Sequence, residues 1–374
     1  MKYVILYGVG YEAENFIYHN MALFSRIVFC IDRYSDRENF HGKPILRLEN
    51  LSNEELRGYQ IIVAASKNAY FEIKKALQYR KLSEFKDFFW SQLYGKKVIV
   101  ANTNCYGPPI INYLNAIWGG KGGFFVYPTP MVHENINREL DENLLNNADV
   151  YIHQNIKADN KYGYRLSDEY ILPRLKDGCQ VITIPNCIEL GYWCYPNIRY
   201  EGKAYVFKDC QFIVLRDTVL DEAYQQGCSN IMEYRKYWNS YRYNEKVLKE
   251  LYEDNMERMI KRETLGRWDI TMSDYIKKHY RDTQIYSECR HLTGEVYGYI
   301  GDEILKRLNI KAEAHGKLAM GNSLTVPILP SVKEFYGMKF SDKAYINAFA
   351  ENEAENPVDN YIRSYIWFWY DKVI

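Results

Sequence analysis

A strand-turn-helix pattern that occurs twice, first at the N-terminus and again from residue 96, constrains the fold of this chain more than any other feature. The first copy begins with the apolar run KYVILY at 2–7, continues through a glycine-containing turn and ends in a helical stretch near residue 23. A second apolar run at 26–31 follows. Short, continuous apolar runs that alternate with helical stretches are typical of parallel sheets covered by helices, so we predict an α/β fold.

The turn after the first run has the pattern G-x-G-x-x-A, with Gly8 and Gly10 as its glycines and Asp32 located 22 positions after Gly10. Such a turn lets the backbone approach a phosphate, and an acidic residue at this spacing binds a ribose. We therefore predict a Rossmann-like N-terminal module over 1–95, in which these three residues are candidates for binding a nucleotide or a sugar nucleotide. The alternative is a module that keeps the turn for structure or for docking a protein. At about 90 residues the module is small for a whole dinucleotide, which disfavours a dehydrogenase.

Charge and composition exclude several classes of protein. Lys plus Arg and Asp plus Glu each number 48, so no net field attracts nucleic acid. No stretch reaches the length of an apolar membrane span, and the N-terminus lacks an export signal, so we expect a cytoplasmic protein. The 8 cysteines are scattered without a C-x-x-C pair, which predicts reduced, mostly buried thiols and no metal site.

The second copy of the pattern predicts a larger domain over 96–340. Further strands are expected at 123–127, 150–153, 180–184 and 204–207, and later helices at 229–262, 271–279 and up to residue 308. Polar clusters follow three of the strands, at 102–105, 153–155 and 185–186. We predict an SGNH-like or flavodoxin-like parallel-sheet domain with added helices, whose ligands lie beyond the carboxyl ends of the strands. The aromatic-rich segment 341–374 is expected to pack on a domain or on a second copy in a homo-oligomer.

Cys105 is the candidate nucleophile. It follows the strand VIVA and precedes Gly107 and two prolines, which favour the first turn of a helix. A helix N-terminus favours a thiolate and offers backbone N–H groups to an oxyanion. A buried cysteine in a tight turn is the alternative.

Glu288 and His291 supply a candidate acid and base. Their three-residue spacing would place the carboxylate against the imidazole if both lie on one helical turn. The pair resembles the late D-x-x-H of SGNH-type esterases and acyltransferases. On the same resemblance, Asn155 could donate an amide to the oxyanion, and His153 could hold substrate hydroxyls or cap its strand.

Several segments, in their order along the chain, resemble the WcbI-like family of capsular polysaccharide biosynthesis proteins. They are VIVANTNCYG, DVYIHQNI, LPRLKDGCQVITIPN, GRWDITMSDYIKKHYRD, YSECRHLTGEVYGYIGDEIL and LTVPILPSVKEFYGMKF. The N-terminal segment is similar to small sugar-nucleotide-binding modules of bacterial polysaccharide enzymes. The chain departs from the family at Tyr106, where glutamine is common, and at Leu292, where proline is common.

The resemblance implies a coenzyme A-binding O-acetyltransferase that uses acetyl-CoA to modify a sugar or glycan hydroxyl. By that resemblance Cys105 is the cysteine of the turn, Asn104 precedes it, Gln154 is the glutamine of a middle strand, and His291 is the late histidine. Cations near the matching segments are candidates for the cofactor phosphates, and they are Lys261, Arg262, Arg267 and Arg290.

Three alternatives stay open from the sequence. Cys105 could carry the acetyl group as a thioester, or it could only bind while His291 deprotonates the acceptor directly. An SGNH-like carbohydrate esterase would use the same residues with water as the acceptor. A non-catalytic sugar-nucleotide-binding or scaffold protein of polysaccharide assembly would leave Cys105 inert.

Overall fold

The structure is a computed structural model that describes residues 3–118, 123–207, 210–311, 325–342 and 356–370. The chain forms two compact units. Unit 1 comprises Met1–Asn104 and Trp118–Val181, and unit 2 comprises Cys105–Ile117 and Ile182–Ile374. Parallel sheets and many helices confirm the predicted α/β class.

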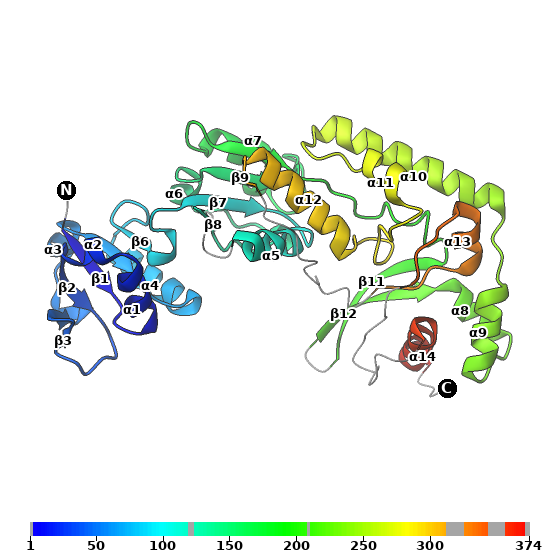
Figure 1. Ribbon diagram of the computed structural model, residues 1–374, viewed down its shortest axis with the longest axis horizontal. Helices are drawn as coiled ribbons and strands as arrows, with labels where there is room; N and C mark the ends of the chain where they lie inside the picture. The colour runs from blue at the N-terminus through cyan, green and yellow to red at the C-terminus, as the bar shows by residue number, and fades with distance from the viewer. Residues whose placement is uncertain (1–2, 119–122, 208–209, 312–324, 343–355, 371–374) are drawn as a thin grey trace. The chain divides into compact units, whose positions relative to one another are not determined.

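The first sheet of unit 1 lies within the N-terminal segment for which a Rossmann-like module was predicted (Figure 1). Its strands are β1 (Val4–Tyr7), β2 (Ile27–Ile31), β3 (Asn39–Phe40), β4 (Lys43–Leu46), β5 (Gln60–Val63) and β6 (Phe88–Trp90). Their order is β3-β4-β2-β1-β5-β6, and every neighbouring pair is parallel except β3 with β4. All four residues of β1 are buried, as expected for a central strand covered on both faces.

The helical segments around this sheet are α1 (Tyr11–His19), α2 (Met21–Phe24), η1 (Leu48–Asn50), α3 (Asn53–Arg57), α4 (Lys67–Tyr79) and η2 (Ser91–Leu93). Ser52 begins α3 with a capping box, because its hydroxyl accepts the N–H of Glu55 and the Glu55 carboxylate accepts the N–H of Ser52. The sequence pattern does not predict α3, β3, β4 or β6.

The second sheet of unit 1 has the order typical of flavodoxin-like folds. Its strands are β7 (Lys97–Asn102), β8 (Phe124–Val126), β9 (Val150–His153) and β10 (Gln180–Thr183), and their order is β8-β7-β9-β10. The strand order reverses at β7, which pairs in parallel with both β8 and β9. Such a switch point is where ligands of open parallel sheets bind. The short helical segments here are η3 (Val132–Glu134), α6 (Glu142–Leu145), η4 (Tyr164–Leu166), α7 (Asp168–Ile171) and η5 (Leu172–Arg174).

One hydrophobic core is shared by the two sheets of unit 1, and it contains Ile5 and Val63 of the first sheet with Val100 and Tyr151 of the second. The predicted boundary between 1–95 and 96–340 therefore falls inside a compact unit. The predicted C-terminal segment 341–374 falls inside unit 2.

Unit 2 is mainly helical. Its helices are α5 (Gly107–Trp118), α8 (Thr218–Gln225), α9 (Ile231–Ser240), α10 (Glu245–Gly266), α11 (Ser273–His279), α12 (Gly294–Arg307), α13 (Pro330–Tyr336) and α14 (Pro357–Tyr370). The helical stretch predicted at 229–262 forms the two helices α9 and α10. The strand predicted at 204–207 belongs to β11 (Ile198–Phe207), which forms an antiparallel pair with β12 (Cys210–Asp217).

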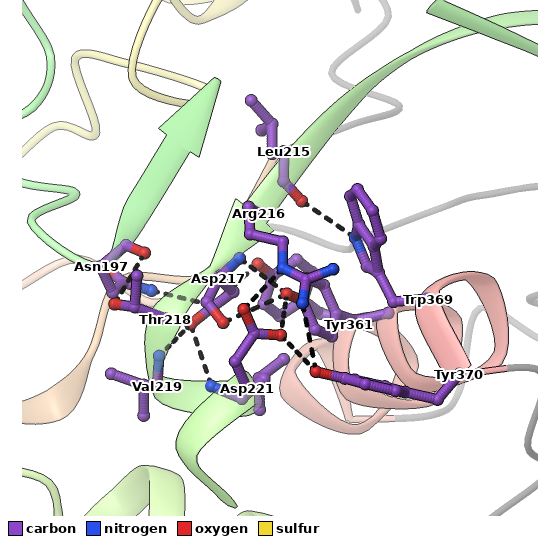
Figure 2. A network of polar contacts seen from close by, with 12 residues as sticks. Asn197, Leu215, Arg216, Asp217, Thr218, Val219, Asp221, Tyr361, Trp369 and Tyr370 are labelled. Carbon is purple, nitrogen blue, oxygen red and sulfur yellow. Dashed lines mark hydrogen bonds and ion pairs between the residues drawn. The ribbon is translucent and has the colours of Figure 1, made fainter. Parts of the chain in front are cut away.

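Helix α14 packs on α8 and α9 within unit 2 (Figure 1). Figure 2 shows the polar network at this contact. The buried carboxylate of Asp217 accepts hydrogen bonds from the backbone N–H groups of Val219 and Leu220, from the Asn197 amide and from the Tyr361 hydroxyl. Asp217 thus begins α8 as its N-cap and also holds α14 in place.

Among the described residues, no helix has both the length and the apolar character needed to cross a membrane. No cluster of three or more metal-ligating side chains occurs among these residues either. Seven cysteines have described side chains, and all are free thiols: Cys30, Cys105, Cys179, Cys187, Cys194, Cys228 and Cys289.

Candidate active site

Cys105 lies in the turn between β7 and α5, and it is half-buried. The helix starts at Gly107, and the next two residues are Pro108 and Pro109, which fit the first turn of a helix but carry no backbone N–H. On the helix side of the thiol, the first two backbone N–H groups are therefore those of Tyr106 and Gly107.

Glu288 and His291 lie in a tight hairpin and not on a helical turn. Tyr286 and Leu292 form an antiparallel bridge, and the Ser287 N–H donates to the His291 carbonyl at 2.9 Å. The predicted contact between the Glu288 carboxylate and the His291 ring is present. It results from the hairpin turn and not from residues three apart on a helix.

A neighbouring glycine allows the hairpin to fold this closely. The N–H of Gly191 donates to the Cys289 carbonyl at 3.1 Å. A Cβ atom on Gly191 would lie 2.8 Å from the Tyr286 ring and 2.9 Å from the Cys289 carbonyl oxygen, which are distances that real Cβ atoms essentially never show. Only glycine fits at this position.

The hairpin brings His291 to Cys105. The Nε2 atom of His291 lies 3.2 Å from the Sγ atom of Cys105, and its Nδ1 atom is hydrogen-bonded to Oε1 of Glu288. The residue Glu288 is 7% exposed. Its other carboxylate oxygen accepts a hydrogen bond from the Arg290 N–H at 2.8 Å and another from the Cys289 thiol at 3.4 Å. Both oxygens of Glu288 are thus held by the hairpin itself, and this fixes the imidazole orientation.

The His291 imidazole carries a proton at neutral pH. Burial lowers its pKa, but the hydrogen bonds with Cys105 and Glu288 and the charge of Glu288 outweigh burial and raise the pKa to about 10. A cationic imidazole that is hydrogen-bonded to a thiol is the arrangement that favours a nucleophilic thiolate.

The predicted polar residues Asn104 and 153–155 lie in unit 1, whereas 185–186 lie in unit 2. The Asn104 N–H donates to the Gln154 side-chain oxygen at 2.9 Å. His153 is buried, with its Nδ1 atom 2.9 Å from Asp168, and the Asn155 amide donates to the other oxygen of Asp168 at 3.2 Å. Sequence reasoning missed Asp168, because nothing in the pattern around it distinguishes this carboxylate from an ordinary surface acid at the start of a helix.

The three predicted cofactor-binding arginines all belong to unit 2, in different surroundings. One guanidinium nitrogen of Arg262 donates to the carbonyls of Ile188 at 2.8 Å and Asn186 at 3.2 Å, so this side chain braces the loop after β10. Arg267 ends α10 in the left-handed conformation. Arg290 precedes His291 in the hairpin.

The Arg290 guanidinium carbon lies 3.8 Å from the centre of the Tyr200 ring. Its Nε atom is buried and meets no hydrogen-bond acceptor among the residues that the structure describes. Arg290 therefore combines proximity to the Cys105–His291 pair with an unused donor.

The predicted nucleotide-binding residues of the N-terminal module lie at the carboxyl ends of β1 and β2. Gly8 has φ +105°, and a Cβ atom there would lie 2.4 Å from the Ala64 carbonyl oxygen. Gly10 is the N-cap of α1. One oxygen of Asp32 accepts the Val9 N–H at 3.1 Å, and the other accepts two N–H groups of the following turn at 2.8 Å. Asp32 thus has a structural role, and its binding of a ribose stays a prediction.

Comparison with known proteins places the chain in a family. The family model described as polysaccharide biosynthesis enzyme WcbI matches residues 98–313. A solved structure of WcbI, described as the native protein without a disulfide bond between CoA and a cysteine, is similar with a TM-score of 0.53 and 13% sequence identity. The similarity covers 73% of this chain and 90% of that chain, and at this identity it shows a shared fold. No curated protein matches the chain.

Proposed function

Because the chain belongs to the WcbI family of polysaccharide biosynthesis enzymes, we propose that it transfers an acetyl group from acetyl-CoA to a sugar hydroxyl of a surface polysaccharide, with Cys105 as the nucleophile. The observation that carries this proposal is the contact of 3.2 Å between Cys105 and His291, with Glu288 on the far side of the imidazole. A nucleophile, a base and an orienting carboxylate in this order are the parts that acyl transfer requires.

The first half-reaction forms a thioester. The Cys105 thiolate attacks the acetyl carbonyl carbon, and the resulting oxyanion is held by the backbone N–H groups of Tyr106 and Gly107 at the start of α5. The carbon–sulfur bond to CoA then breaks, and protonated His291 donates its proton to the departing CoA thiolate. Acetyl-Cys105, free CoA thiol and a neutral imidazole remain.

The second half-reaction returns the enzyme to its starting state. Neutral His291 accepts the proton of the sugar hydroxyl while the hydroxyl oxygen attacks the acetyl carbon. The bond to the Cys105 sulfur breaks, which leaves an acetylated sugar and the original thiolate beside a protonated imidazole. The high pKa of His291 favours this covalent route over direct deprotonation of the acceptor, because a base that is already protonated first needs to give its proton to a leaving group.

The CoA phosphates require cations, and Arg290 is the best candidate of the three arginines. Its guanidinium has a buried, unused donor, whereas Arg262 already binds two backbone carbonyls. The similar WcbI structure is described with CoA, which supports CoA as the ligand class. The contributions of Asn104, His153, Gln154 and Asn155 to the oxyanion or the acceptor stay predictions, as do the cytoplasmic location and the homo-oligomer.

Calorimetric titration with CoA and with acetyl-CoA tests the proposal, followed by mass spectrometry of the peptide that contains Cys105 after incubation with acetyl-CoA. We expect binding of both ligands and the mass increase of one acetyl group on that peptide. Cys105→Ala should abolish the mass increase, while Cys228→Ala, which removes another half-buried thiol of unit 2, should not. Ester hydrolysis without CoA binding would instead identify an esterase, and a folded protein with neither property would identify a binding or scaffold protein.

A further inference from the structure

Two consecutive residues before α5 contact two consecutive residues of the hairpin. Cys105 Sγ lies 3.2 Å from His291 Nε2, and the Tyr106 hydroxyl donates to the Arg290 carbonyl oxygen at 2.6 Å. Because the Arg290 carbonyl belongs to the peptide that leads into His291, the second contact restricts how this peptide can rotate. The two contacts together determine where the imidazole lies relative to the thiol.

The backbone of Arg290 is held from both sides. Its N–H donates to Glu288 at 2.8 Å, and its C=O accepts from Tyr106. Glu288 uses its other oxygen to orient the His291 ring. Without the Tyr106 hydroxyl, the Arg290 carbonyl would lose its partner, and the hairpin would be free to turn the imidazole away from the thiol.

The Tyr106 ring fills the space behind this contact. It is 0% exposed, packs edge-on against Tyr297 of α12 with ring centres 5.6 Å apart, and lies 6.2 Å from the His291 ring. Burial raises the pKa of Tyr106 well above its ordinary value, so the hydroxyl remains protonated and acts as a donor. Because the ring is fully buried, Tyr106→Phe would remove only the hydroxyl and leave the packing of the ring in place.

We propose that Tyr106 is a positioning residue, whose hydroxyl fixes the hairpin so that His291 faces Cys105. This inference depends on the proposed function only in that it takes the Cys105–His291 pair as the reactive site. Its test requires neither CoA nor a sugar, because the reactivity of the Cys105 thiol is measured directly.

The test compares Tyr106→Phe with Tyr336→Phe as a matched control. Tyr336 is also a buried tyrosine of unit 2 whose hydroxyl donates to a backbone carbonyl, that of Leu248 on α10. The readout is the rate at which iodoacetamide modifies Cys105, followed by peptide mass spectrometry from pH 5 to 10. Thermal unfolding of each variant measures the general cost of losing one buried hydrogen bond.

We expect both variants to lose a similar amount of thermal stability, and only Tyr106→Phe to change the pH profile. In that variant the rate at pH 7 should fall about 5- to 20-fold, because the imidazole no longer faces the thiol. Tyr106→4-aminophenylalanine keeps a donor at the ring para position and should restore the wild-type profile.

If Tyr106→Phe does not fold, 4-fluorophenylalanine at this position replaces it as the variant without a donor. Equal profiles for the wild type and the donor-less variant would overturn the inference, whatever the outcome of the CoA titration.

Discussion

The Nε2 atom of His291 lies 3.2 Å from the Sγ atom of Cys105, although the two residues are 186 positions apart in the sequence. The Glu288 carboxylate on the other side of the ring completes a line of three groups that are poised for proton transfer. This line lies within one compact unit, so its geometry depends on the packing of α5 and the hairpin in that unit.

The stability of the protein should depend on the proton of His291. Its pKa in the folded protein is about 10, above the ordinary value of 6.5, so the proton stabilises the folded state fully below about pH 6.5. This contribution is lost as the pH rises through 10. Because one pKa unit corresponds to about 1.4 kcal/mol, we expect a loss of roughly 2 kcal/mol or more in unfolding free energy between pH 7 and 10.

Urea unfolding at a series of pH values measures this loss, and His291→Asn serves as the control because it cannot be protonated. The variant should be less stable at pH 7 and should lack most of the decline toward pH 10. Parallel curves for the two proteins would contradict the assigned role of His291.

Cys105 should be the first thiol to react with iodoacetamide at pH 7. Among the described cysteine side chains, the two other half-buried thiols are Cys179, whose pKa burial raises to about 11, and Cys228, whose pKa burial also raises. We expect Cys105 to react at least about 10-fold faster than either, and His291→Ala to remove most of this advantage. Peptide mapping by mass spectrometry measures all three rates in one sample. Comparable rates at the three thiols would show that His291 does not activate Cys105.

The sequence predicts many strands of the two parallel sheets and most of the later helices, but it misses the short strands β3, β4 and β6. Apolar runs such as those at 3–7 and 98–101 predict buried parallel strands, because a strand covered on both faces buries nearly all of its side chains. The segment that forms α14 was expected only to pack, because its aromatic residues have modest helix propensity, and its helix depends on contacts with Asp217.

The candidate site was only partly predictable. The residue types Cys, Glu and His indicate the chemistry, but a hairpin brings the three side chains into contact. That hairpin packs against Gly191, about 100 residues earlier in the sequence, where a larger residue would collide with it. The contact of Tyr106 with Arg290 spans 184 positions and leaves no local pattern. A buried tyrosine next to the nucleophile has the same appearance in sequence whether it only packs or also holds the base.

Asp217 should contribute strongly to the docking of α14 (Figure 2). All four described hydrogen-bond partners of its carboxylate are donors, so in Asp217→Asn the new amide group would face the Asn197 amide or the backbone N–H groups of α8. We expect a loss of about 2 kcal/mol in unfolding free energy. Tyr361→Phe removes one donor and should lose about 1 kcal/mol. Chemical denaturation measures both, with Asp254→Asn on the exposed face of α10 as the control. A change within about 0.5 kcal/mol for Asp217→Asn would contradict this role.

Two glycines of α12 should respond to alanine in opposite directions. A Cβ atom on Gly301 would lie 2.3 Å from the Tyr113 ring of α5, whereas one on Gly298 would lie 3.4 Å from the same ring, at ordinary contact distance. Alanine favours an internal helical position over glycine by about 1 kcal/mol, so Gly298→Ala should stabilise the protein by up to that amount. Gly301→Ala should destabilise it by about 1–3 kcal/mol, because α5 and α12 need to separate. Because the turn with Cys105 leads into α5 and α12 follows His291, Gly301→Ala should also slow the alkylation of Cys105. Equal effects of the two variants on unfolding free energy and on alkylation would show that α12 does not support the site through its contact with Tyr113.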